Sequence, residues 1–129
     1  MRVMLLIYNN EATTADWSGP QGPRFQAAHR TLIHELTSRA ELVQSSEIAP
    51  GDALSVTRRQ GAMLVNAVEH TGADWLGGYY LVDVHDVARA IEITARLPEI
   101  TTSYVEVRHV PTAPTPIRRR ARTSVRSLC

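Results

Sequence analysis

Two nearly continuous apolar segments constrain the fold of this chain more than any other feature. Val3–Tyr8 (VMLLIY) and Tyr79–Val84 (YYLVDV) both have the composition of strands that are buried on both faces. The second segment is followed by a helical pattern and then by Tyr104–Val110, where apolar and mixed side chains alternate. We therefore expect the first two segments at the centre of a sheet and the third near an edge.

A pair of shorter strands is predicted between the two central ones. Ala53–Arg58 and Ala62–Val68 are rich in β-prone residues. They are separated by Arg59, Gln60 and Gly61, where the glycine permits the positive φ angle of a tight hairpin. These strands are expected either at the outside of the sheet or as a separate ribbon.

Two segments have helical spacing. In Pro23–Arg39 the apolar stripe recurs at helical intervals and consists of Phe25, Ala28, His29, Leu32, Ile33 and Leu36. A second helix is predicted to begin near Asp86, whose carboxylate can accept from the free amides of the first turn, and to end before Pro98. Asp83 is the alternative cap.

The order of these elements is strand, helix, strand pair, strand, helix, strand. It predicts an α+β protein with a ferredoxin-like βαββαβ antiparallel sheet and two helices on one face. The other face would expose an apolar patch larger than soluble monomers normally carry, so a homodimer is expected.

The length of 129 residues predicts one domain, expected at residues 1–110. No apolar run approaches the roughly 20 residues of a membrane helix. Met1-Arg2 leads directly into the first strand without the cleavage pattern of a signal peptide. A cytoplasmic protein without membrane contact is therefore expected. The single cysteine, Cys129, excludes an intramolecular disulfide and a thiolate metal cage.

The charge is distributed unevenly. Residues 1–110 hold nine arginines and thirteen acidic residues, a formal charge of −4, whereas residues 111–129 hold five arginines and no acid. This second segment has three prolines and little apolar content, so a disordered Arg/Pro-rich tail is expected. A basic tail can contact nucleic acid, but we expect a solvated extension and no nucleic-acid partner.

Several motifs resemble the YCII-related proteins, and specifically their DGPF subgroup. The opening MRVMLLIY is similar to that subgroup's YMLLIY-like first strand, and LGGYYLVDV with the later VEVRHV is similar to its LGGYYLID and VEVRPV segments. The resemblance implies a ferredoxin-like fold, two sheets packed face to face in a dimeric α/β barrel, and a small-molecule pocket between sheet and helices.

His29 is the candidate catalytic residue. It falls on the apolar stripe of the first predicted helix, and QAAHRTL is similar to the PAHLxxL-like helix motif of YCII-type members. A neutral imidazole that faces a pocket can act as a general acid or base near neutral pH. The alternative is a core histidine that bonds to a backbone carbonyl.

The segment before Leu76 departs from the resemblance, because the subgroup's TDGPFAETKEQ is replaced by NAVEHTGADW. The replacement is polar, and five of its residues are candidates for binding a substrate: Asn66, Glu69, His70, Asp74 and Trp75. Gly72 weakens any helical pairing of His70 with Asp74, so no metal site is expected. Gly77-Gly78 is expected to allow a close backbone approach or a bulge.

Aromatic residues complete the candidate binding set. Asn9–Gly22 is predicted to be a connection of 14 residues, and its Trp17 either closes a pocket or pins the loop to the body. Tyr8 and Tyr79 lie on the central strands, where a phenol can hold a substrate carbonyl or simply pack. Because side chains alternate along a strand, Tyr79 and Tyr80 face opposite sides of the sheet.

Three functions remain open at this stage. The resemblance to α/β-barrel relatives such as muconolactone isomerase implies a cofactor-independent isomerase, lyase or cyclase acting on a small organic molecule of bacterial secondary or aromatic metabolism. Cofactor-free monooxygenases of the same barrel group suggest a second activity, which would use Asn66, Trp75 and Tyr79. The third function is a non-catalytic ligand-binding or sigma-factor-associated regulatory protein. No Gly-rich phosphate loop is present, and no cofactor is expected.

Overall fold

The computed structural model describes residues 1–68 and 74–111. A four-stranded antiparallel sheet has the order β2-β5-β1-β6, with β1 at Arg2–Asn9, β2 at Leu42–Glu47, β5 at Trp75–Asp83 and β6 at Val105–Val110. Its helices are α1 at Glu11–Ser18, α2 at Gly22–Ser38 and α3 at Val87–Thr94, followed by a short 3-10 helix at Pro98–Thr101.

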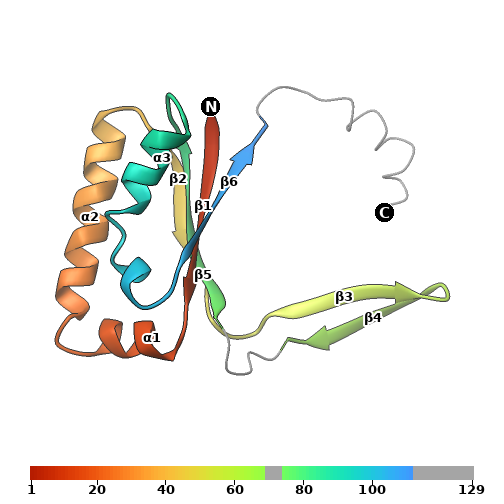
Figure 1. Ribbon diagram of the computed structural model, residues 1–129. Coiled ribbons are helices and arrows are strands. Elements are labelled where there is room, and N and C mark those ends of the chain that lie inside the picture. The colour runs from red at the N-terminus through yellow and green to blue at the C-terminus, as the bar shows by residue number, and fades with distance from the viewer. Residues whose placement is uncertain (69–73, 112–129) are drawn as a thin grey trace.

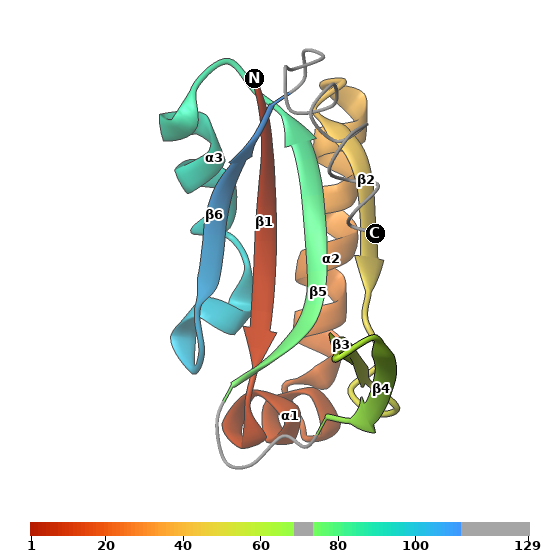
Figure 2. The same ribbon diagram turned by 90° about the vertical axis from the view of Figure 1, so that its right-hand side faces the viewer.

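The helices cover one face of this sheet, and no described helix covers the opposite face, which we call the open face (Figures 1 and 2). This is the predicted α+β, ferredoxin-like arrangement, with Val3–Tyr8 and Tyr79–Val84 on the two central strands β1 and β5. The core lies between the sheet and the helices. It is built from Val3, Leu5, Ile7, Leu32, Leu36, Tyr80, Val82, Val84, Ala90, Ile93 and Leu97.

Two elements of the secondary structure were not predicted from the sequence. The connection Asn9–Gly22 contains a helix, α1, because the Asn10 side chain caps it by accepting from the Thr13 amide at 3.0 Å. The expectation of two helices therefore misses one. The fourth strand of the sheet is β2, whose sequence LVQSSE has too few apolar residues to stand out from a loop.

The predicted hairpin forms the separate ribbon. β3 at Leu54–Arg59 and β4 at Ala62–Ala67 pair only with each other among the described strands, and the turn has positive φ angles at Gln60 and Gly61. We call residues 54–67 the arm. It projects from the body on the side of the open sheet face (Figure 1).

The arm has one apolar face. Register places Val56 opposite Val65, and Arg58 opposite Met63, so alternate positions of the two strands meet on the same side. The large apolar residues of this face are strongly exposed: Leu54 65%, Val56 59%, Met63 61% and Val65 54%. An isolated two-stranded hairpin is marginally stable in water, so the arm lacks a packing partner within the described chain.

The second predicted helix begins as expected. Asp86 is the N-cap of α3, and its carboxylate accepts from the Arg89 amide at 3.0 Å. Arg89 in turn donates two hydrogen bonds to Glu41, at 3.0 and 2.9 Å, and so ties α3 to the start of β2. None of the described helices is both long and apolar enough to cross a membrane.

Candidate functional site

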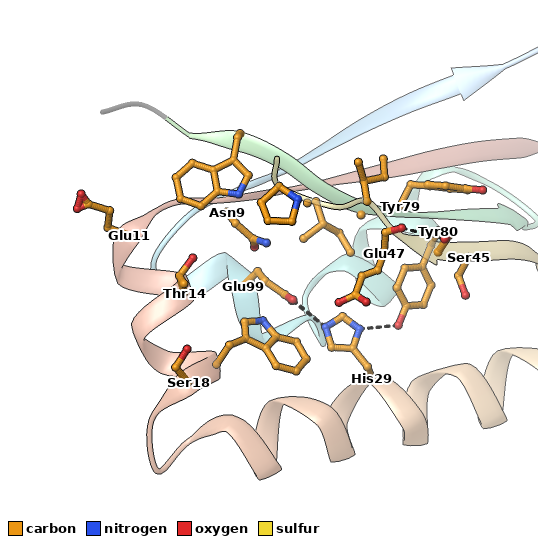
Figure 3. Close-up of a pocket in the computed structure, with 18 of the residues that line it drawn as sticks. Asn9, Glu11, Thr14, Ser18, His29, Ser45, Glu47, Tyr79, Tyr80 and Glu99 are labelled. Atoms are coloured by element: carbon orange, nitrogen blue, oxygen red, sulfur yellow. Dashed lines mark hydrogen bonds and ion pairs between the residues drawn. The ribbon is translucent and has the colours of Figure 1, made fainter. Parts of the chain in front are cut away.

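A cavity of about 800 Å³ opens where α1 and α2 meet the ends of β1, β2 and β5. Its lining is mostly apolar and aromatic, with a few polar side chains, which is the usual character of a small-molecule site. His29 from α2 lies in its wall (Figure 3), and the other lining residues come from β1, α1, α2, β2, β5, the 3-10 helix and the segment after β2.

Both ring nitrogens of His29 are bonded to side chains. Nδ1 lies 2.7 Å from the Tyr80 hydroxyl, and Nε2 lies 2.8 and 3.0 Å from the two carboxylate oxygens of Glu99. A carboxylate only accepts, so Nε2 carries a hydrogen and donates it to Glu99. In the neutral imidazole Nδ1 then accepts from the Tyr80 hydroxyl.

The three groups are removed from bulk water to different degrees. The side chain of Glu99 is 4% exposed, that of His29 is 17% exposed, and Tyr80 is 3% exposed as a residue. Burial, reinforced by the charge of Glu99, raises the pKa of the Tyr80 hydroxyl far above its ordinary value. Tyr80 is therefore a phenol that stays protonated and donates.

Trp17 forms a wall of the cavity and stacks on the histidine. Its ring centroid lies 5.7 Å from that of His29, at an interplanar angle of 27°. It also forms a T-shaped pair with Phe25, with the two ring centroids 5.5 Å apart. α1 holds this indole in place through Thr13, which is fully buried and bonds to Thr102 at 2.7 Å. Trp17 therefore both lines the cavity and joins α1 to α2.

The two adjacent glycines of β5 shape the opposite wall. The register with β1 shifts at Ile7 and Tyr8, which makes Gly77 the extra residue of a bulge, as the sequence predicted. A side chain at Gly77 would overlap the amide of Asn9, and one at Gly78 would press on the Ser46 carbonyl. Asn9 can therefore lie against β5 and line the cavity.

Five further candidates come from β5 and the residues just before it. Trp75 and Tyr79 line the cavity, although Tyr79 directs its ring to the opposite face of the sheet from Tyr80. Asp74 is exposed and accepts from Asn10 at 2.9 Å, so it anchors the start of α1. Glu69 and His70 lie outside the described residues.

Two candidates lie away from the cavity. Asn66 is exposed on β4 of the arm. Tyr8 lies on the open face, where it stacks on Tyr104 at 4.7 Å and donates a long 3.4 Å hydrogen bond to Glu106. Partial desolvation and the charge of Glu106 raise the pKa of Tyr8.

Sequence reasoning did not select Tyr80, Glu99 or Glu47, which also line the cavity. Tyr80 could have been found from the alternation of side-chain directions along β5, because that alternation directs one of the two adjacent tyrosines toward the helices. Glu99 and Glu47 had no periodic signal, since one lies in a 3-10 helix and the other ends the unrecognised strand β2. Within residues 1–68 and 74–111, no group of three His, Cys, Asp or Glu side chains is arranged to hold a metal ion.

Comparison with known proteins agrees with this architecture. The sequence model of the YCII-related domain matches residues 1–112 of the chain. A search of curated proteins finds no match. Because the match spans most of the sequence and the described fold, the chain belongs to the YCII-related domain family.

Proposed function

We propose that the protein is a cofactor-independent enzyme that transfers protons on a small organic molecule bound in the cavity. The observation that carries this proposal is the Glu99–His29–Tyr80 chain of hydrogen bonds in the cavity wall. A carboxylate that orients an imidazole, which in turn contacts a hydroxyl, is a recurrent arrangement for acid–base catalysis.

The chemistry follows from the hydrogen-bond directions. The Tyr80 hydroxyl first turns from Nδ1 to an oxygen of the substrate, which frees the lone pair of Nδ1. Nδ1 then takes a proton from the substrate, and Glu99 stabilises the resulting imidazolium by accepting from Nε2. Tyr80 then accepts from Nδ1 and can donate its own hydrogen to the oxyanion that forms on the substrate. Return of the proton to another atom of the substrate completes an isomerisation, and expulsion of a leaving group completes an elimination.

Isotope exchange tests this activity without knowledge of the substrate. A panel of enolisable ketones and lactones is incubated with the protein in D2O, without added cofactor, and loss of carbon-bound hydrogen is followed by proton NMR. His29→Ala should lower exchange of an active compound about 100-fold or more, as expected for loss of a general base. His34→Ala is the matched control, because His34 is on the same helix and exposed.

The second candidate function is binding without turnover, as in a regulatory protein. It is favoured by the fact that both nitrogens of His29 are already bonded within the fold, as in a structural histidine. The resemblance to the DGPF subgroup without its DGPF motif also suits a lost ancestral activity. This function would be excluded if the wild-type protein catalyses exchange and His29→Ala abolishes it. A tightly bound metabolite together with no exchange would support it.

We also propose that the protein works as a homodimer. The open sheet face carries half-buried apolar side chains, namely Met4, Leu6, Tyr8, Tyr79 and Leu81. The arm projects on the same side (Figure 1), and the apolar side chains of its one face are exposed. A second copy related by a twofold axis would cover the open sheet with its own, and each arm would then reach the partner.

A further inference from the structure

We propose that the ligand of the cavity is an organic cation: a flat apolar molecule that carries a protonated amine. This inference rests on the cavity being the substrate site proposed above. It extends that proposal by naming the charge and shape of the substrate, and three independent features of the cavity support it.

The first feature is an acidic side chain without a partner. Glu47 ends β2, and Figure 3 shows its carboxylate directed into the cavity on the side of His29. Within the described chain its side chain takes part in no hydrogen bond or ion pair, whereas Glu99 is already bonded to His29. Glu47 is therefore available to a ligand. Glu11 also lines the cavity but points away from it.

The second feature is the sign of the charge around the ligand. No arginine is found among the described residues that line the cavity, and the chain contains no lysine. The carboxylates of Glu47, which is exposed, and Glu99, which is buried, make the charge at the cavity negative, which concentrates cations and disfavours carboxylates and phosphates. A phosphate or carboxylate site would require the opposite set of side chains.

The third feature is the combination of aromatic walls and a free acceptor. Both tryptophans of the chain, Trp17 and Trp75, line the cavity, and indole faces attract ammonium groups. Asn9 lines it as well, and its buried amide oxygen accepts no hydrogen bond from the described residues. A ligand N–H group would provide the missing donor, because a buried acceptor left unpaired is costly.

Three probes that share a 2-phenylethyl group and differ in the charge of its terminal group test the inference: 2-phenylethylammonium, 2-phenylethanol and 3-phenylpropanoate. Their affinities for the full-length protein are measured by calorimetry and by tryptophan fluorescence excited at a wavelength where the phenyl ring is transparent. The ammonium should bind about tenfold more tightly than the alcohol, and the propanoate more weakly than either. Of the three probes, only the ammonium should bind more weakly when salt is added, and its affinity should approach that of the alcohol.

Glu47→Gln keeps the size of the side chain and removes its charge. It should lower the affinity for the ammonium about fivefold and leave the affinity for the alcohol unchanged. Glu92→Gln is the matched control, because Glu92 is an exposed carboxylate of α3 that does not line the cavity. Equal binding of all three probes, a preference for the propanoate, or an unchanged ammonium affinity in Glu47→Gln would overturn the inference. These binding results do not depend on turnover, so they are separate from the isotope-exchange test of the proposed function.

Discussion

Replacing Tyr80 with phenylalanine removes one hydroxyl from the centre of the proposed site. The hydroxyl lies 2.7 Å from Nδ1 of His29, and Tyr80 is 3% exposed. The phenylalanine would leave the imidazole nitrogen without its donor. Since an unsatisfied buried polar group costs about 1–3 kcal/mol and His29 keeps slight access to water, we expect the free energy of unfolding to fall by about 1–2 kcal/mol.

Tyr8→Phe is the matched control. Its hydroxyl also makes one side-chain hydrogen bond, to Glu106, but at 3.4 Å, beyond the usual range for a hydroxyl donor. Glu106 keeps its ion pair with Arg108 at 3.0 Å and is 36% exposed, so water replaces the lost donor. We expect the free energy of unfolding of Tyr8→Phe to change by less than about 0.5 kcal/mol.

Urea unfolding followed by circular dichroism measures both variants, at one fixed protein concentration because any self-association contributes to stability. Exchange activity toward an active compound should also fall about 100-fold in Tyr80→Phe and stay unchanged in Tyr8→Phe. Equal stabilities of the two variants would refute the reasoning, since they would mean that the Tyr80 hydroxyl is not held against the imidazole.

Three other predictions concern the rest of the molecule. The half-buried guanidinium of Arg89 holds the pKa of Glu41 below its usual value. This pair therefore stabilises the fold above about pH 5, and the stabilisation is lost as the pH falls through the lowered pKa. Glu41→Gln should flatten the acid limb of a plot of the free energy of unfolding against pH. Val56→Glu on the arm should dissociate the proposed dimer, as measured by size-exclusion chromatography with light scattering. Ile91→Glu should not, because Ile91 lies on α3 and is already 57% exposed there. Identical behaviour of the two variants would contradict the docking of the arm on the partner. Gly77→Ala should displace the Asn9 amide and weaken phenylethylammonium binding in calorimetry, and unchanged binding would remove Asn9 from the site.

The central part of the fold could be predicted because its signals are local. Burial on both faces makes β1 and β5 nearly continuous apolar runs, and the stripe of α2 reports the core directly. β2 gave no such signal, since it is an edge strand in which Gln44, Ser45 and Ser46 follow two apolar residues. α1 was missed because its stability comes from the Asn10 cap and the burial of Thr13, and not from an apolar stripe.

Residues of the candidate site were predicted only where the sequence of one helix or one connection was enough to single them out. His29 was found because a histidine on an apolar stripe is unusual, and Trp17 because an indole in a long connection is conspicuous. Its partners could not be found in this way. Glu99 follows His29 by 70 residues and belongs to a short 3-10 helix, so only tertiary structure brings its carboxylate to the imidazole.

The position of the arm explains why the order of the predicted strands could not by itself identify the second edge strand of the sheet. In this chain the hairpin is inserted between β2 and β5, which pair directly with each other, so the arm is an addition to the four-stranded sheet. Both ends of the insertion lie beside the cavity, since Glu47 and Pro50 precede the arm and Trp75 follows it. A partner that fixes the arm would therefore also fix the two chain segments that carry Glu47 and Trp75. Ligand affinity and dimerisation should consequently be coupled, with the ammonium probe bound more weakly by a variant that cannot dimerise.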